Sequence, residues 1–286
     1  MQVDFHVHST ASDGSVPPAE LVARAKGYAA LALTDHDNCD GVAAAAAASR
    51  AADLRFVPGI ELSIDPGESF HQFHLLGLGI DPTHPALTDF LRRVLEGRNA
   101  RNARITENFR RLGIVMEDIA DYAHGEVLAR PHYARWLVDH GLARDIPDAF
   151  ARYLQPDSPA ETRCYETRYK PSQAEAFAVI HAAGGLCVMA HPRYWRREWK
   201  SAGCDYAAAE RELARLKEAG LDGLEAFYQA NTFDENIRFA RLADRFGLLK
   251  SAGSDFHGAN KAAIPLGMDV PEDFIRPLFE RLLMCK

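Results

Sequence analysis

Short apolar segments, each followed by histidines or acidic residues, recur along most of this chain of 286 residues and constrain its fold more than any other feature. The apolar segments alternate with stretches rich in helix-forming residues. Such alternation predicts β-α-β units with parallel strands. The expected strands span residues 2–8, 31–34, 55–64, 73–80, 186–190, 223–227 and 248–253.

This number of strands fits an α/β barrel slightly smaller than the eight-stranded form. The alternation breaks off after the fourth strand, where residues 86–113 predict a helix and residues 114–165 contain helical pieces without a clear strand. We therefore expect an inserted helical subdomain at residues 100–165, within a barrel domain formed by residues 1–99 and 166–286. The arginines of the first helix are expected to lie on a solvated face, with steering of a polyanion as the alternative. They are Arg92, Arg93, Arg98, Arg101, Arg104, Arg110 and Arg111.

Composition narrows the class of protein. The formal net charge of −7 argues against a broad basic face for nonspecific nucleic-acid binding, although bound cations could still create a local anion pocket. The N-terminal residues lack the basic and apolar regions of a signal peptide, and no apolar run is long enough to span a bilayer. The cysteines form no CxxC pair, so we expect reduced thiols in a cytoplasmic protein with no membrane and no obligate protein partner. They are Cys39, Cys164, Cys187, Cys204 and Cys285.

Polar residues gather where the expected strands end, which is where α/β barrels place their chemistry. His6 and His8 form an HxH pair, and the alternation of a strand puts both imidazoles on one face. The segments TDHD at 34–37 and SDFH at 254–257 repeat this pattern after the second and the last strand. Each piece alone could be an ordinary turn or core segment, but their recurrence at nearly every strand end predicts a metal site.

The candidate ligands are more numerous than one or two ions require, so we expect three divalent ions. Histidine and carboxylate ligands without cysteine suit manganese, zinc or iron. A carboxylate such as Glu61 in an apolar strand is costly unless it is paired or bound to a metal. The candidates are His6, His8, Asp13, His36, Glu61, His74, His191, Asp255 and His257.

The order of these motifs resembles that of the PHP (polymerase and histidinol phosphatase) superfamily of metal-dependent phosphoesterases. The matching motifs are HxH at 6–8, TDHD at 34–37, GIE at 59–61, the strand histidine His74, AHP at 190–192 and SDFH at 254–257. The opening HVHSTASDG at 6–14 is most similar to a bacterial branch with an inserted helical subdomain. That branch includes phosphatases of nucleoside 3′,5′-bisphosphates and 5′→3′ exoribonucleases. The resemblance implies a distorted seven-stranded TIM-like barrel, (β/α)7, with a trinuclear metal centre.

The resemblance also implies how the metal ions, Mn²⁺ as first choice with Zn²⁺ or Fe²⁺ as alternatives, are shared among the candidates. His6 and His8 would hold the first ion, with Glu61 and Asp255 also reaching it. Glu61 would bridge to a second ion completed by His74 and His191. The third ion would be held by Asp13, His36 and His257.

The expected mechanism is in-line attack on phosphorus by a hydroxide that the metals activate. The resemblance makes Asp35 a residue that orients a ligand or the attacking water. Asp255 or a site histidine such as His191 would supply the proton for the leaving oxygen.

Basic residues close to the motifs are candidates for phosphate binding, because arginine suits forked phosphate contacts and lysine acts as a point charge. Arg193 in HPR and Arg130 in ARPH of the insertion resemble phosphate-binding segments of the branch named above, and Lys170, Ser12 and His132 complete the candidate set. The insertion would then form a substrate cap. The expected substrate is a nucleoside 3′,5′-bisphosphate that loses its 3′-phosphate, with a short 5′-phosphorylated RNA as a further substrate.

Three other functions remain open. The first is hydrolysis of histidinol phosphate or another small phosphate ester. The second is a non-catalytic, metal-bearing PHP module. The third is an amidohydrolase-type C–N hydrolase, which the TDHD and SDFH segments fit poorly.

Overall fold

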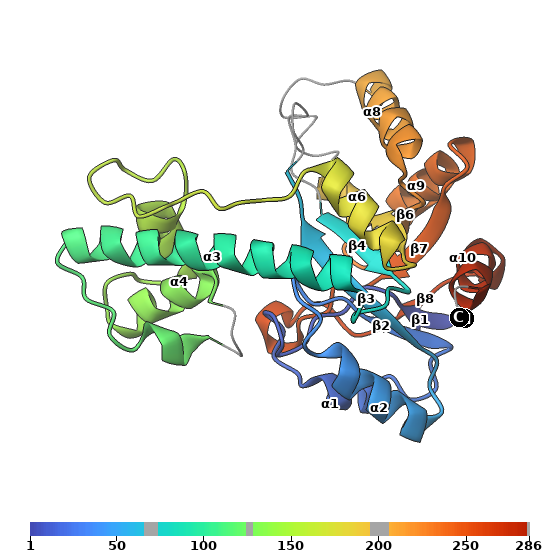
Figure 1. The fold of residues 1–286 in the computed structure, drawn as a ribbon, viewed down its shortest axis with the longest axis horizontal. Coiled ribbons are helices and arrows are strands. Elements are labelled where there is room, and N and C mark those ends of the chain that lie inside the picture. Colours follow the sequence, from blue (N-terminus) through green and yellow to red (C-terminus); the bar gives the residue numbers. More distant parts are fainter. Residues whose placement is uncertain (66–73, 124–127, 195–205, 285–286) are drawn as a thin grey trace. The chain divides into compact units, whose positions relative to one another are not determined.

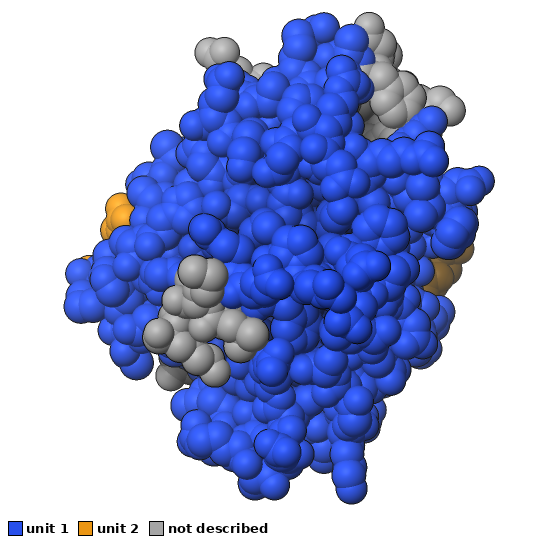
Figure 2. Space-filling view, turned by 90° about the vertical axis from the view of Figure 1, so that its right-hand side faces the viewer, with its two compact units in different colours: residues 1–91, 171–286 blue, residues 92–170 orange. Residues whose placement is uncertain are grey.

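The computed structural model describes residues 1–65, 74–123, 128–194 and 206–284. The chain divides into two compact units, coloured separately in Figure 2. Unit 1 consists of Met1–Leu91 and Pro171–Lys286, and unit 2 of Arg92–Lys170. Unit 2 includes the predicted insertion at 100–165, and its role as a substrate cap stays a prediction. Among the described residues, no helix has both the length and the apolar composition needed to cross a bilayer.

Unit 1 is built on a mixed sheet, which confirms the predicted barrel-like α/β fold (Figure 1). The strands lie in the order β7-β6-β5-β4-β3-β2-β1-β8, so those that follow one another in sequence are neighbours up to β7. The added strand β8 is short and antiparallel to β1, so the sheet has one strand more than predicted. The strands are β1 (Gln2–Asp4), β2 (Ala30–Leu33), β3 (Phe56–Ser63), β4 (His74–Leu78), β5 (Leu186–Met189), β6 (Gly223–Tyr228), β7 (Leu249–Gly253) and β8 (Met268–Asp269).

The sheet closes where the segment after β1 meets the end of β7 and the residues that follow it. The amide of Phe5 donates to the carbonyl of Ala252 at 2.9 Å, and that of Asp255 donates to His6 at 2.9 Å. The strand predicted at residues 2–8 is therefore regular only in its first part. Beyond Asp4 the chain exchanges hydrogen bonds with the SDFH segment, which brings two of the predicted metal-binding motifs side by side.

The expectation that all strands are parallel is wrong for β4. This strand is antiparallel to both β3 and β5, whereas β1–β2, β2–β3, β5–β6 and β6–β7 are parallel. A parallel crossover needs a connection of a dozen residues or more, usually a helix. Only residues 64–73 separate β3 from β4, so the chain reverses direction.

Helices cover the sheet of unit 1 because their apolar faces need a partner. Leu21 and Val22 of α1 pack with Ala45 of α2 against Leu31 and Leu33 of β2. The helices are α1 (Pro18–Arg24), α2 (Val42–Ala52), α6 (Gln173–Ala182), α8 (Tyr206–Ala219), α9 (Phe233–Arg245), the 3-10 turn η3 (Gly258–Lys261) and α10 (Glu272–Met284).

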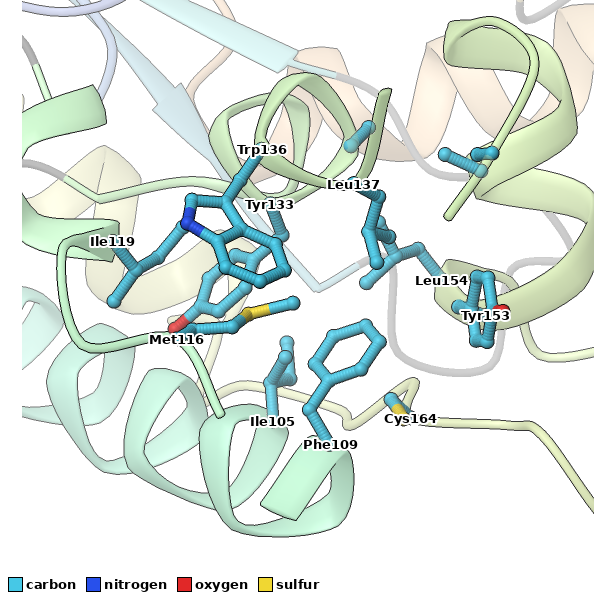
Figure 3. Close-up of a cluster of buried hydrophobic side chains, with 13 residues drawn as sticks. Ile105, Phe109, Met116, Ile119, Tyr133, Trp136, Leu137, Tyr153, Leu154 and Cys164 are labelled. Atoms are coloured by element: carbon cyan, nitrogen blue, oxygen red, sulfur yellow. The ribbon is translucent and has the colours of Figure 1, made fainter. Parts of the chain in front are cut away.

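Unit 2 has a hydrophobic core of its own, as expected for a separately packed helical subdomain. Phe109 of α3 lies between Tyr133 of α4 and Tyr153 of η2, with ring centroids 6.2 and 5.6 Å away (Figure 3). Its elements are the later part of α3 (Pro85–Arg111), η1 (Ile119–Tyr122), α4 (Arg130–Asp139), α5 (Ile146–Ala149) and η2 (Phe150–Leu154).

The prediction of a solvated arginine face on α3 is wrong for two of its arginines. Arg98 and Arg101 are 7% and 4% exposed. Helical periodicity does not reveal this burial, because arginine is normally a surface residue whose apolar stem alone is covered.

Candidate metal centre

The predicted ligands of unit 1 come together at the ends of its strands. His6 and His8 follow β1, His36 follows β2, and His191 follows β5. The remaining predicted ligands lie in β3 (Glu61), at the start of β4 (His74), in the loop before α1 (Asp13), and after β7 (Asp255 and His257). Segments far apart in sequence thus supply one cluster of ionisable side chains.

Glu61 is the centre of this cluster and is fully buried. Each of its carboxylate oxygens faces a different group of histidines, so a single side chain could serve two neighbouring cations. Oε2 lies 3.2, 3.1 and 3.0 Å from His6 Nε2, His8 Nε2 and His36 Nδ1, and Oε1 lies 2.8 and 3.0 Å from His74 Nδ1 and His191 Nε2.

A second group surrounds Asp13. Its Oδ1 lies 3.2 Å from His257 Nε2 and 3.8 Å from His8 Nδ1, and its Oδ2 lies 3.9 Å from His36 Nε2. One ligand atom from each of these residues lies within 4.8 Å of the others, which is close enough to hold one ion. His8 and His36 contact both this group and Glu61, so the cluster is continuous.

Asp255 presents one oxygen to the histidines and the other to two residues that were not predicted. Oδ1 lies 3.4 Å from His8 Nε2. Oδ2 accepts hydrogen bonds from the Tyr228 hydroxyl at 3.0 Å and from Lys261 Nζ at 2.7 Å. These two donors hold the carboxylate in one orientation.

The side chains fit bound cations better than they fit one another. Nε2 of His6 lies only 3.1 Å from Nε2 of His8. Within the described residues, the buried atoms His8 Nδ1, His36 Nδ1 and Glu61 Oε2 have no hydrogen-bond partner. Buried polar atoms without partners are costly, and cations that accept lone pairs from all of them would remove that cost.

In the metal-free cluster, the carboxylates and the histidines stabilise each other's charged forms. Burial opposes protonation of His6, but the charges of Glu225 and Glu61 outweigh it and raise its pKa well above the usual value. Burial likewise opposes protonation of His8, but the adjacent carboxylates of Asp255 and Glu61 outweigh it and raise its pKa to about 9. Burial would also raise the pKa of Glu61, yet the surrounding histidines, His36 and His6 first, hold that pKa well below its usual value.

Asp35 fixes the loop that carries Asp13. Its Oδ1 accepts from the amide of Ser9 at 2.7 Å and from the hydroxyl of Ser12 at 2.6 Å, and its Oδ2 accepts from the hydroxyl of Ser9 at 2.7 Å. Both oxygens are therefore used inside the protein. This geometry fits a residue that orients a ligand loop, and it makes Ser12 part of that loop's support.

Two further buried carboxylates were not predicted. Asp4 accepts hydrogen bonds from the amide and hydroxyl of Ser254 at 2.9 and 2.6 Å, and so ties β1 to the SDFH segment. Glu225 contacts His6 and the backbone of His191. The signal that could have revealed both is the one applied to Glu61, a carboxylate inside an apolar strand.

The backbone is left-handed at several of these positions. His191 has φ of 31° and Asp255 has φ of 60°, and neither is glycine. Asp37, which accepts a hydrogen bond from the amide of Ser63, has φ of 56°. Such conformations cost energy and persist where the surroundings impose them, often at functional sites.

The predicted phosphate contacts are distributed over both units. In unit 1, Nε of Arg193 lies 3.9 Å from Glu235 of α9. In unit 2, Arg130 donates to the carbonyl of Leu154 at 3.2 Å, and His132 Nδ1 accepts from the backbone at the start of α4. Lys170, also in unit 2, is partly buried.

Known proteins resemble this chain in sequence and in structure. A family model for the PHP domain matches residues 4–130. Over 98% of its length the chain is 35% identical to a 3′,5′-nucleoside bisphosphate phosphatase of Chromobacterium violaceum, of which 96% is covered. Over 89% of its length it is 36% identical to a 5′-3′ exoribonuclease of Haemophilus influenzae, of which 89% is covered.

Two solved structures share the whole fold. One is a Chromobacterium violaceum protein described as an amidohydrolase and solved with bound sulfate and no metal. Its TM-score is 0.81 at 35% identity, over 99% of this chain and 96% of that one. The other is described as a metal-dependent phosphoesterase of Bifidobacterium adolescentis, with a TM-score of 0.78 at 28% identity, over 98% of this chain and 96% of that one.

The fold, the histidine–carboxylate cluster and the similarity to these proteins together show that this protein is a hydrolase that acts on phosphoric ester bonds. The chain belongs to the PHP domain family.

Proposed function

We propose that this protein removes the 3′-phosphate from nucleoside 3′,5′-bisphosphates. The observation that carries the proposal is the continuous histidine–carboxylate cluster centred on Glu61, which has donors for more than one cation. The named activity of the Chromobacterium violaceum relative supports the choice of substrate. Other small phosphate esters, histidinol phosphate among them, are the alternative substrates.

The predicted ligands would hold the cations as follows. His6, His8, Glu61 and Asp255 would surround one ion, and Glu61 would also serve a second with His74 and His191. Asp13, His36 and His257, which lie together with His8, would hold a third. Manganese, zinc or iron suits these donors. When bound, the ions would polarise the phosphoryl group and supply a nucleophile at neutral pH.

Asp255 is better suited to be a ligand than a proton donor. Burial would raise its pKa, but the hydrogen bond to His8 and the charges of His6 and Lys261 hold the pKa well below its usual value. Lys261 and Tyr228 further fix its outer oxygen.

Unit 2 supports the choice of a substrate with a second phosphate. Burial, together with the nearby charges of Arg98, Arg168 and Arg130, lowers the pKa of Arg101 to about 10. Nε of Arg101 is buried and has no hydrogen-bond partner among the described residues. A doubly charged phosphate would relieve the repulsion within this arginine cluster, and arginine can grip it through two hydrogen bonds.

The test compares kcat/KM for adenosine 3′,5′-bisphosphate and for 3′-AMP. We expect a preference for the bisphosphate, and we expect Arg130→Ala to remove it at a cost of about 2–4 kcal/mol in transition-state stabilisation. Removing the second phosphate from the substrate and replacing Arg130 by alanine should not have additive effects, because both changes delete the same contact. Arg135→Ala changes an exposed arginine of the same helix and is the control. Equal rates on both substrates would replace this proposal with a general phosphatase.

A short RNA with a 5′-phosphate is a second candidate substrate. The arginine cluster of unit 2 contains more guanidinium groups than one phosphate requires, and the Haemophilus influenzae relative is named an exoribonuclease. If RNA is a substrate, a 5′-phosphorylated oligonucleotide should be degraded much faster than the same sequence with a 5′-hydroxyl. Equal rates would mean that no arginine-bound 5′-phosphate is needed.

A further inference from the structure

Glu225 lies outside the predicted metal ligands and touches two of them. It is the third residue of β6 and is fully buried, with 0% of its surface exposed. Its Oε1 lies 2.9 Å from Nδ1 of His6, and its Oε2 accepts a hydrogen bond from the amide of His191 at 2.5 Å. One carboxylate thus connects the segments that follow β1 and β5.

The first contact determines which ring nitrogen of His6 is available to a cation. A carboxylate is an acceptor, so Nδ1 of His6 carries the proton that it shares with Glu225. The lone pair of Nε2 is then directed to the side where His8 and Glu61 lie, at 3.1 and 3.2 Å. Carboxylate partners of this kind fix the tautomer and orientation of metal-binding histidines.

The second contact supports the backbone of His191. This residue has φ of 31°, which a residue with a side chain seldom adopts without support from its surroundings. The hydrogen bond from its amide to Glu225 holds the chain in the conformation that brings its Nε2 to 3.0 Å from Glu61.

Both contacts need a hydrogen-bond acceptor, and a carboxylate offers one at each of its two oxygens. A glutamine at position 225 would present one oxygen and one NH₂ group, so either His6 or His191 would face a donor instead of an acceptor. The space is also tight, because a Cβ at Gly253 would collide with Glu225 and His6. The carboxylate therefore has little freedom to adjust.

We propose that Glu225 is a positioning residue of the metal centre, which holds His6 and His191 in register for cation binding without being a ligand itself. The inference rests on the proposed metal centre and is independent of the substrate. Loss of such an outer contact typically costs about 10–100-fold in metal affinity.

Asp222 provides a matched control three residues earlier in the chain. Its Oδ2 also accepts from a histidine ring, His181 Nε2 at 2.8 Å, and from a backbone amide, that of Cys187 at 2.8 Å. It precedes β6, whereas most of the proposed ligands follow the strands that carry them. Asp222→Asn therefore disrupts the same kinds of contact, to a histidine ring and to a backbone amide, at the other end of the strand.

The experiment measures Mn²⁺ affinity of the full-length protein by calorimetry, at a temperature where each variant is folded, together with thermal unfolding in EDTA. We expect Glu225→Gln to bind Mn²⁺ about 10–100-fold more weakly than wild type. Asp222→Asn should bind as wild type does, although it unfolds at a lower temperature. Wild-type affinity in Glu225→Gln, or an equal loss in Asp222→Asn, would overturn the proposal.

A second measurement needs no variant. In the Zn²⁺-loaded wild type, long-range ¹H–¹⁵N correlation spectra should show His6 protonated at Nδ1 and ligating through Nε2. Ligation through Nδ1 would refute a role for Glu225 as its partner. If wild type bound neither Mn²⁺ nor Zn²⁺, the proposed metal centre would fail, which is a different outcome from either result for Glu225.

Discussion

Glu61 occupies an unusual position for a carboxylate, since five histidines face its two oxygens and no solvent reaches it. In the proposed centre it is shared between two cations, so its removal should affect both. Glu61→Gln should lose turnover and most bound metal, a larger effect than the about 10–100-fold expected for an outer contact. Metal content after dialysis and phosphate release measure the two effects. A variant with full metal content and wild-type rate would contradict the assignment of Glu61 as a ligand.

His8 gives a prediction for the pH dependence of metal binding. The adjacent carboxylates of Asp255 and Glu61 outweigh its burial and raise its pKa in the metal-free protein to about 9. At pH 7 the ring is therefore protonated, and a cation must displace that proton. Affinity for Zn²⁺ should rise with pH up to about 9, about tenfold per unit for each proton displaced. Calorimetry in buffers of different ionisation enthalpy detects the released protons, and their absence would contradict a protonated His8 that becomes a ligand.

At the scale of elements, the junction between β1 and β7 brings the HxH and SDFH segments together. Gly253 ends β7, and a Cβ there would collide with His6 and Glu225. Gly253→Ala should therefore weaken metal binding without altering a ligand, because β7 must move away from His6. The measurement is Mn²⁺ affinity of the folded protein.

Ser251 of the same strand offers the control for that change. Its hydroxyl is buried and has no hydrogen-bond partner among the described residues. Ser251→Ala removes an unpaired polar group and should leave both stability and metal affinity close to those of wild type. If Gly253→Ala also binds Mn²⁺ normally, the junction tolerates more adjustment than its packing indicates.

The order of strands and their polar ends could be predicted from the sequence, because hydrophobic patterning and strand-end ligands are local signals. The direction of β4 could also have been inferred, since residues 64–73 are too few for a crossover helix. The carboxylate of Glu225 inside an apolar strand is a local signal, but its partners and those of Lys261 could not be predicted, because they depend on which strand or loop lies beside each residue. The burial of Arg101 likewise depends on tertiary packing, which α3 alone does not reveal.

At the scale of the whole molecule, unit 2 has its own core, and unit 1 contains the proposed metal centre. Phe109 is fully buried in the core of unit 2, between two tyrosine rings. Phe109→Ala should destabilise unit 2 by about 3–5 kcal/mol. Mn²⁺ affinity should remain that of wild type, whereas the preference for the bisphosphate should be lost.

Hydrogen exchange resolves the two units, because protection would fall selectively in α3 and α4. Val115→Ala changes an exposed side chain of unit 2 and should have little effect. Loss of metal binding in Phe109→Ala would instead mean that the units unfold together.

The left-handed backbone at Asp37, His191 and Asp255 has a consequence for engineering this protein. Glycine adopts such conformations without strain, so it would relax the backbone at each of these positions. A selection for heat resistance alone, without metal or substrate, should therefore enrich glycine at these positions and yield more stable but inactive proteins. Thermostable variants should be sought under a simultaneous requirement for phosphate release, so that stability is gained at other positions.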